Sequence, residues 1–133
     1  ARKGVLDEVA LGLPALMRAV KLQKRAARVG FDWPQTDQVL DKLIEESHEL
    51  VEARDQLDTD EIEEEFGDLL FALVNLARKN GINPDDALEY TNQKFRNRFM
   101  FIEDKAKAMN KNMIDMSLAE MDEIWNESKK LGM

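Results

Sequence analysis

Apolar residues recur at helical spacing through most of this chain, and turn-forming residues divide them into separate segments. The first segment opens at Pro14 and ends before Gly30, and Lys and Arg alternate with its apolar positions, which is typical of an amphipathic helix. A second apolar stripe extends over about residues 37–56. No stretch alternates with a period of two for long enough to form a strand. The pattern therefore predicts an all-α fold.

Capping residues mark the boundaries of three further helices. Gly81 predicts the end of the third helix, and the fourth is expected to extend to about residue 110. Short connections between the second, third and fourth helices favour antiparallel neighbours, so we expect an antiparallel bundle of about five helices in one domain over residues 1–133. The residues that predict helix starts are Thr59 and Asp60 for the third helix, Asn83 and Pro84 for the fourth, and Ser117 with Glu120 for the fifth.

Acidic residues gather at two places, one on the second predicted helix and one on the third. Glu46 and Glu49 stand three residues apart, as do Glu65 and Asp68, so each pair shares one face of its helix. Glu45 lies on the same polar side as the first pair. Both acidic faces border the apolar stripes through which the helices are expected to pack, and packed helix axes lie about 8–10 Å apart. Four converging carboxylates repel one another without cations, so the pattern predicts a Mg²⁺ site suited to chemistry on phosphates.

Two other interpretations of the acidic residues have to be weighed. Solvated glutamates explain an isolated E-E-x-x-E pattern well, because acidic helix faces are common. The second acidic pair, on the next helix, makes solvated glutamates a much weaker explanation of the whole pattern. Glu45 and His48 also form an E-x-x-H pair of the kind found in di-iron bundles, but such sites need a second histidine on another helix. His48 is the only histidine, so the di-iron interpretation fails.

Composition restricts the function classes further. The formal net charge of −8 disfavours a nucleic-acid backbone as a partner, since phosphate binding needs an excess of Lys and Arg, but it suits a protein that concentrates divalent cations. The lack of cysteine excludes disulfides and thiolate metal sites. No apolar run reaches the roughly 20 residues of a membrane-spanning helix. We expect a cytoplasmic protein without a nucleic-acid or membrane partner.

A triphosphate site also needs positive charges that lie outside the metal centre. Lys94 and Arg98 stand one helical turn apart, and Lys42 stands one turn before the first acidic pair. These bases either clamp phosphate oxygens or remain solvated. Taken in isolation, their positions favour the solvated interpretation. Trp33 and Trp125 are candidates for stacking on a base, although a tryptophan more often packs in a core. The chain has no P-loop, no dinucleotide fingerprint and no Ser/His/Asp or Cys nucleophile set.

Several short motifs point together to one family. They are LPALM at 13–17, VGFDW at 29–33, Lys42 with EESHE at 45–49, EEEFGDLLF at 63–71, VNLAR at 74–78, NQKF at 92–95 with Arg98 and Phe99, and Trp125. With these motifs the chain resembles the MazG family of nucleoside triphosphate pyrophosphohydrolases, in the all-α NTP pyrophosphatase superfamily. The resemblance covers nearly the whole chain and is strongest to the second, catalytically active repeat of tandem MazG proteins. Only one repeat is present, so we expect the chain to be a piece of a longer protein.

The resemblance implies a specific set of site residues. In this family the acids of the E-E-x-x-E and E-x-x-D motifs hold Mg²⁺, and Mn²⁺ is a candidate substitute. The metal ligands implied are Glu46, Glu49, Glu65 and Asp68. Nucleotide-binding roles are implied for Lys42, Asn75, Lys94, Arg98 and Trp125, and for Trp33, whose loop otherwise serves only to hold the fold. Glu45 completes the catalytic set, and two roles are open to it, orienting the attacking water or supporting Lys42.

The expected function is Mg²⁺-dependent hydrolysis of nucleoside triphosphates to the monophosphate and pyrophosphate, without a covalent intermediate. The resemblance implies a role in removing non-standard or excess nucleotides, and it implies a homodimer or higher homo-oligomer. The alternative is a non-catalytic regulatory or dimerisation module that keeps the bundle. An inactive repeat is expected to lose acids or phosphate-facing bases, and this chain retains both. A generic acidic helical scaffold, the third interpretation, predicts no effect of Mg²⁺ on thermal stability.

Overall fold

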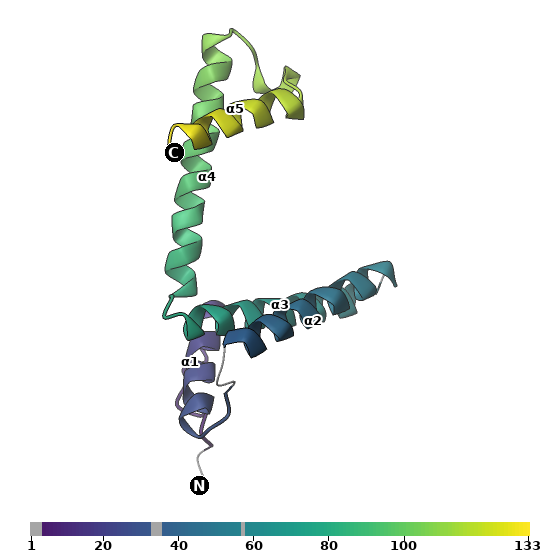
Figure 1. The fold of residues 1–133 in the computed structure, drawn as a ribbon, viewed down its shortest axis with the longest axis vertical. Coiled ribbons are helices and arrows are strands. Elements are labelled where there is room, and N and C mark those ends of the chain that lie inside the picture. Colours follow the sequence, from purple (N-terminus) through teal and green to yellow (C-terminus); the bar gives the residue numbers. More distant parts are fainter. Residues whose placement is uncertain (1–3, 33–35, 57) are drawn as a thin grey trace. The chain divides into compact units, whose positions relative to one another are not determined.

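The computed structural model describes residues 4–32, 36–56 and 58–133, and all regular structure in them is helical (Figure 1). The α-helices are α1 (Ala15–Arg28), α2 (Thr36–Asp55), α3 (Thr59–Lys79), α4 (Pro84–Ala108) and α5 (Leu118–Lys130), and a short 3₁₀ helix, η1 (Met113–Asp115), precedes α5. The all-α prediction with five helices is confirmed, and η1 is an addition to it. Among the described helices, none combines the length and the apolar character that crossing a membrane requires.

Local side-chain contacts explain where two of the helices begin. Asn83 accepts hydrogen bonds from the backbone N–H groups of Asp85 and Asp86, at 2.9 and 3.3 Å, and so caps α4. Ser117 accepts from the backbone N–H of Glu120 at 3.1 Å, and the Glu120 carboxylate accepts from the Ser117 backbone N–H. This reciprocal pair is the predicted capping box of α5.

The start of α3 differs from the prediction by one residue. Thr59 and Asp60 are the predicted caps, but the N-cap is Asp58, whose carboxylate accepts from the backbone N–H groups of Asp60 and Glu61 at 3.1 Å each. Adjacent Asp and Thr residues are all good caps, and Asp58 is the one that precedes the first helical backbone position. The correction leaves the predicted acidic face of α3 unchanged.

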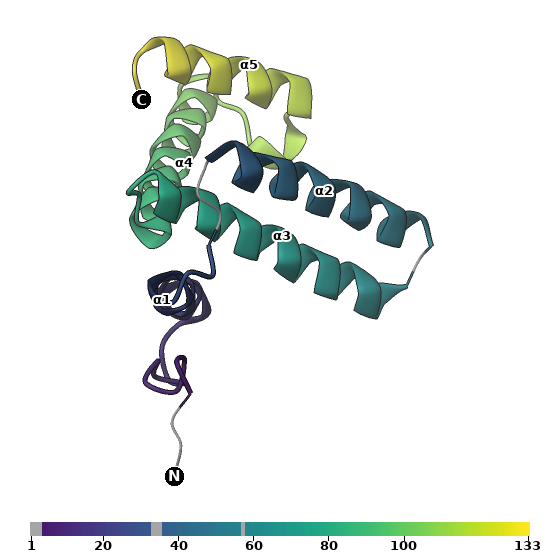
Figure 2. The same cartoon turned by 60° about the horizontal axis from the view of Figure 1, so that its bottom comes forward.

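The chain divides into two compact units, Ala1–Asp86 and Ala87–Met133. In the first unit, α2 and α3 run antiparallel and side by side, and α1 packs against α3 (Figures 1 and 2). The antiparallel pairing of the second and third helices is therefore confirmed. The buried apolar side chains of this pair are Val39, Ala53, Ala72 and Val74.

The second unit has a core of its own, formed by α4, α5 and the segment between them. Ile102 and Ala106 from α4 are buried against Met116 and Ile124. Ser128 is fully buried, and its hydroxyl donates to the Trp125 carbonyl oxygen at 2.6 Å. Because each unit buries its own residues, the expectation of a single domain over residues 1–133 stays a prediction.

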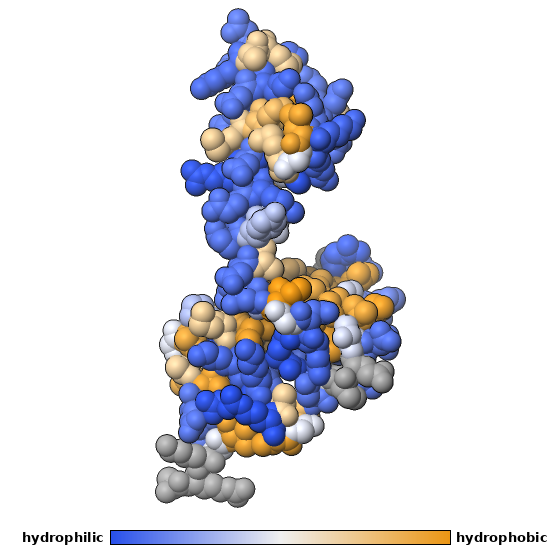
Figure 3. Space-filling model, turned by 60° about the vertical axis from the view of Figure 1, so that its left-hand side comes forward, coloured by the Kyte–Doolittle hydropathy of each residue, from blue (hydrophilic) through white to orange (hydrophobic). Residues whose placement is uncertain are grey.

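Large apolar side chains of α2 and α3 remain at the surface of the first unit. Phe66, Leu70 and Leu73 recur every three or four residues along one face of α3, and each is more than 40% exposed. Leu40 and Ile44 are similarly exposed on α2. Figure 3 shows apolar side chains at the surface of this unit between polar ones. We call these five residues the apolar face of the α2–α3 pair.

Candidate functional site

Three carboxylates from α2 and α3 converge in the first unit. Glu46, Glu49 and Glu65 each place one carboxylate oxygen within 4.8 Å of the other two. Glu46 is only 4% exposed, and the other two are half-buried. The convergence follows from the local structure, because Glu46 and Glu49 lie one turn apart on α2 and Glu65 faces them from the antiparallel α3.

This carboxylate cluster carries more negative charge than its protein surroundings balance. Hydrogen bonding with the Glu65 carboxyl raises the pKa of Glu49 to about 7, and partial burial and the charge of Glu46 act in the same direction. The Oε2 atoms of Glu46 and Glu65 are buried and have no hydrogen-bond partner among the described residues. Buried acceptors without partners are destabilising. A divalent cation that prefers oxygen ligands fits this donor set.

Lys42 balances part of the charge from within α2. Its Nζ lies 2.7 Å from Oε1 of Glu46 and 3.8 Å from Oε2 of Glu45. The hydrogen bond to Glu46 raises the pKa of Lys42 above its ordinary value, so the ammonium group stays charged. Glu46 therefore faces a lysine with one carboxylate oxygen and leaves the other oxygen free for a second cation.

A cavity of about 210 Å³ opens beside these residues, between α2 and α3. Lys42 and Glu46 line it from α2, and Asp68, Phe71 and Asn75 line it from α3. Asp68 is exposed and lies outside the group of three carboxylates, but it borders the same cavity as Glu46. The site thus combines clustered acids, a charged lysine and an open space beside them.

Comparison with known proteins identifies the family to which this arrangement belongs. A model of the MazG nucleotide pyrophosphohydrolase domain matches residues 35–100, which contain the carboxylate cluster, Lys42 and Asp68. The chain is also 46% identical over 132 residues to the nucleoside triphosphate pyrophosphohydrolase of Escherichia coli strain K12, and the match covers 98% of this chain and 50% of the relative. The chain belongs to the MazG family.

Two further relatives extend the comparison. A MazG protein of Thermotoga maritima, named nucleoside triphosphate pyrophosphohydrolase/pyrophosphatase MazG, is 39% identical over 117 residues, covering 88% of this chain and 45% of the relative. The uncharacterized protein YabN of Bacillus subtilis is 47% identical over 131 residues, covering 98% of this chain and 27% of the relative. The chain spans about half the length of the two pyrophosphohydrolases.

Three of the nucleotide-binding residues implied by the MazG motifs lie in the second unit. Arg98 and Trp125 are brought together, since the guanidinium carbon lies 5.2 Å from the centroid of the Trp125 ring. Trp125 also packs on Phe95, with ring centroids 5.6 Å apart. Lys94 lies instead over the Tyr90 ring, with its Nζ 5.5 Å from the centroid. The second unit therefore holds an aromatic cluster, Phe95 with Trp125, that Arg98 borders, whereas Lys94 contacts a different ring.

Two of the predicted nucleotide-binding residues, Asn75 and Trp33, remain to be placed. Asn75 is 3% exposed, lines the cavity beside Glu46, and accepts a hydrogen bond from Arg78 at 2.6 Å. His48, which the di-iron interpretation would have needed as a ligand, is exposed. Trp33 lies outside the described residues.

An ion-pair cluster that the sequence motifs did not predict joins two of the MazG motifs. Asp32, in the VGFDW motif, accepts hydrogen bonds from Arg78 at 2.6 and 3.2 Å and from Lys79 at 2.7 Å. These contacts, chiefly the hydrogen bond from Arg78, lower the pKa of Asp32 from 3.8 to about 2. They tie the loop after α1 to the C-terminal turn of α3, and the positive φ of Gly30, +92°, lets the chain turn there. We call this cluster the Asp32 clasp.

A buried polar residue on α1 was also missed. Gln23 is 6% exposed, and its Nε2 donates to the Phe71 carbonyl oxygen of α3 at 3.1 Å. A signal for it exists in the sequence, because Gln23 lies at helical spacing between Val20 and Ala27, in the apolar stripe of α1. A polar residue in such a stripe indicates a buried hydrogen bond or a ligand contact.

Proposed function

We propose that this chain hydrolyses nucleoside triphosphates to the nucleoside monophosphate and pyrophosphate, the activity for which its relatives from E. coli and T. maritima are named. The observation that carries the proposal is the carboxylate cluster on α2 and α3, with its open cavity and charged Lys42. Clustered acids next to a positive charge suit a polyphosphate that enters together with metal ions.

Glu46, Glu49 and Glu65 are the proposed ligands of Mg²⁺, with Asp68 as the fourth, and Mn²⁺ is a candidate substitute. Support comes from the two buried carboxylate oxygens that have no hydrogen-bond partner within the described part of the chain, and from a donor set made only of oxygen atoms. When bound, the metal screens the phosphate charge and lowers the pKa of a coordinated water. The exposed position of Asp68 on the cavity wall supports a ligand role for it on the substrate side of the metal.

Lys42 is the proposed phosphate-neutralising residue of the first unit. Its ammonium group lines the same cavity as Glu46 and Asp68, and its raised pKa keeps it charged at neutral pH. The 3.8 Å distance between Lys42 Nζ and Glu45 favours a supporting role for Glu45, which holds the lysine in place. Lys94, Arg98 and Trp125 are proposed as further nucleotide contacts, because MazG motifs include them and the latter two pack together.

A homodimer or higher homo-oligomer is part of the same proposal. The apolar face of the α2–α3 pair is left uncovered within the first unit, although its residues recur at helical spacing as a packing surface would. Exposed apolar patches of this kind mark association surfaces. A second copy of this chain supplies a matching face in a two-fold arrangement.

Pyrophosphate release from a panel of nucleoside triphosphates, with and without Mg²⁺, tests the proposed activity. Monophosphate and pyrophosphate are expected in equal amounts and only with the metal. Glu46→Gln and Glu65→Gln should abolish turnover while circular dichroism shows unchanged helix content. Glu63→Gln is the matched control, because Glu63 is exposed on the same helix as Glu65. Full activity in both cluster variants refutes the metal assignment.

Two further results separate the proposal from its rivals. In oxygen-labelled water, the label should enter the monophosphate or the pyrophosphate, and orthophosphate as the primary product would show that a different bond is cut. Absence of turnover for every nucleotide, together with stabilisation of the chain by Mg²⁺, would favour the non-catalytic module instead.

A further inference from the structure

We propose that a second cavity, between α1 and α3, binds the nucleobase of the substrate, and that the side-chain oxygen of Gln23 accepts a hydrogen bond from the hydrogen-bonding edge of that base. The inference rests on the proposed function and deepens it, because it assigns the base to the first unit.

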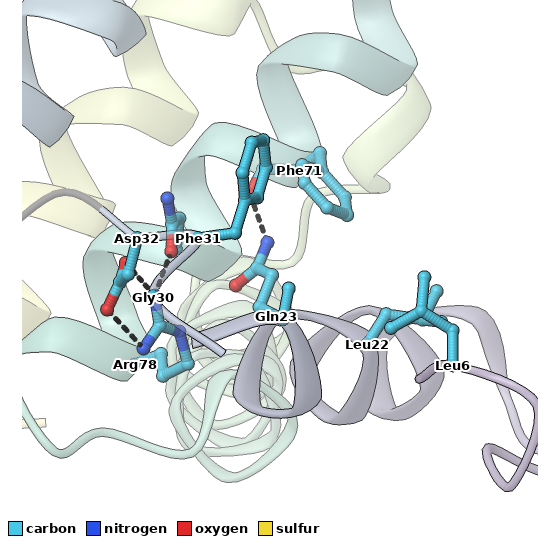
Figure 4. Close-up of a pocket in the computed structure, with 10 residues that line it drawn as sticks. Leu6, Leu22, Gln23, Gly30, Phe31, Asp32, Phe71 and Arg78 are labelled. Carbon is cyan, nitrogen blue, oxygen red and sulfur yellow. Dashed lines mark hydrogen bonds and ion pairs between the residues drawn. The ribbon is translucent and has the colours of Figure 1, made fainter. Parts of the chain in front are cut away.

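The cavity has the size and chemistry of a small-molecule site. It measures about 470 Å³, within the range of about 300–1,000 Å³ that is typical of ligand pockets. Leu6, Leu22, Phe31 and Phe71 contribute apolar and aromatic walls, and Gln23 is among the few polar groups between them. Figure 4 shows these side chains around the cavity. Aromatic walls with a few fixed polar groups suit a flat heteroaromatic ring.

The orientation of the Gln23 amide is determined by its partner. Its Nε2 must face the Phe71 carbonyl oxygen, which can only accept, so the Oε1 points the other way (Figure 4). This oxygen is buried and has no hydrogen-bond partner among the described residues. A buried acceptor of fixed direction in the wall of a cavity gains free energy when a ligand donor meets it. Every nucleobase offers such a donor, an amino group or a ring N–H, on its pairing edge.

The cavity adjoins the proposed metal site. Phe71 and Asn75 line both the 470 Å³ cavity and the smaller cavity beside Glu46. Along α3 the residues follow in order from Asp68 at the metal end to Arg78 at the base end, a rise of about 15 Å. A nucleoside triphosphate has its phosphates and its base at opposite ends, so one molecule can occupy both cavities.

The loop that carries Phe31 completes the pocket. Phe31 lines the cavity yet is 79% exposed, although its backbone N–H donates to the Ala26 carbonyl oxygen at 3.1 Å. The Asp32 clasp holds the next residue to Arg78 and Lys79 on α3. An exposed ring on an anchored loop is suited to stacking on a base, which removes apolar area of both from water.

The test compares substrates that differ only in the base. Initial rates of pyrophosphate release are measured with Mg²⁺ for nucleoside triphosphates and for ribose triphosphate without a base. For the preferred base, an analogue without the edge donor is added: purine riboside triphosphate for ATP, pyrimidinone riboside triphosphate for CTP, N3-methyluridine triphosphate for UTP, or, for GTP, N1-methylinosine triphosphate, which lacks both the ring N–H and the 2-amino group. Losing the donor should lower kcat/KM of the wild type about tenfold, since a buried acceptor is then left unpaired.

Gln23→Met, which keeps the side-chain length and removes the acceptor, should reduce that discrimination to about twofold or less. Gln38→Met is the matched control, because Gln38 is exposed on α2, and it should discriminate as the wild type does. Equal discrimination by the wild type and Gln23→Met overturns the inference. So does a loss of discrimination in Trp125→Ala alone, which would place the base on Trp125.

Phe31→Ala is a second test that should fold even if Gln23→Met does not, because the Phe31 side chain is exposed. It should lower kcat/KM for the nucleotide and not for ribose triphosphate, and an unchanged ratio overturns the inference. The two proposals fail differently. Equal turnover of nucleotides and ribose triphosphate by the wild type refutes the base pocket and leaves the proposed function standing. Absence of turnover for all of these compounds refutes the proposed function and the pocket with it.

Discussion

Asp32→Asn is the perturbation whose size follows most directly from the structure. The Asp32 carboxylate is 19% exposed and accepts hydrogen bonds from two cationic side chains, Arg78 and Lys79. An asparagine keeps the shape and one acceptor but removes the charge that both partners face. The loop after α1 then loses its ionic connection to the end of α3.

The magnitude comes from the pKa of the carboxyl group. Lowering this pKa from 3.8 to about 2 corresponds to about 2 kcal/mol of stabilisation of the folded state by the ionised form. Because the folded-state pKa lies below the unfolded one, this contribution is fully present above about pH 4 and is lost as the pH falls towards 2. Asp32→Asn should therefore lower the free energy of unfolding by about 2 kcal/mol at neutral pH and by progressively less below pH 4.

Urea unfolding followed by circular dichroism, from neutral pH downward, measures this difference. Asp41→Asn is the control, because Asp41 is exposed on α2, and its unfolding midpoint should stay near that of the wild type. Carbon NMR titration of the Asp32 carboxyl reports the pKa directly. The reasoning is wrong if Asp32→Asn unfolds at the wild-type midpoint at neutral pH, or if the difference between the two proteins is as large at pH 2 as at pH 7.

Three further predictions concern the metal, the assembly and a helix cap. Mg²⁺ alone should raise the melting temperature of the wild type, as measured by scanning fluorimetry, because a ligand at ten times its Kd adds about 1.4 kcal/mol to the free energy of unfolding. An equal shift in Glu46→Gln would contradict the proposed metal site. Leu70→Glu, on the apolar face, should reduce the mass measured by light scattering to that of the monomer, whereas an unchanged oligomer would place the interface elsewhere. Ser117→Ala removes the capping box of α5 and should lower the free energy of unfolding of the second unit by about 1 kcal/mol, as measured by urea unfolding. An unaltered urea midpoint would show that the capping box does not stabilise α5.

The helices and most of their ends follow from local signals in the sequence. Asn83 and the Ser117–Glu120 pair cap the helices that they were predicted to cap, because these signals depend only on residues within one turn. The spacing of Glu46 and Glu49 was likewise sufficient to place both on one face of α2. Asp58 shows the limit of such signals, because adjacent residues of equal capping ability are distinguished only by where the helical backbone begins.

Contacts between distant segments could not be predicted from such local signals. Asp32 and Arg78 belong to two motifs that were both noted, yet nothing in either motif states that they pair. The hydrogen bond of Gln23 depends on the packing of α1 against α3, because this packing brings its amide beside the Phe71 carbonyl oxygen. Periodicity identifies the face of a helix that is buried, but it does not identify the helix that covers it. Such pairings become visible only in the folded chain.

Helix α3 carries proposed metal ligands in its N-terminal half and the partners of the Asp32 clasp at its C-terminal end. Glu65 lies in the N-terminal half of α3 and Arg78 in its last turn, about 20 Å apart along the helix axis. Perturbations at such a distance act nearly additively unless the sites share partners, and Asn75, which accepts from Arg78, lines the cavity beside Glu46 but does not belong to the carboxylate cluster. Loss of the clasp should therefore weaken binding at the base end of α3, while the stabilisation by Mg²⁺ at the other end persists. If loss of the clasp also abolished the response to Mg²⁺, α3 would not be the rigid connection between the two cavities that their shared walls indicate.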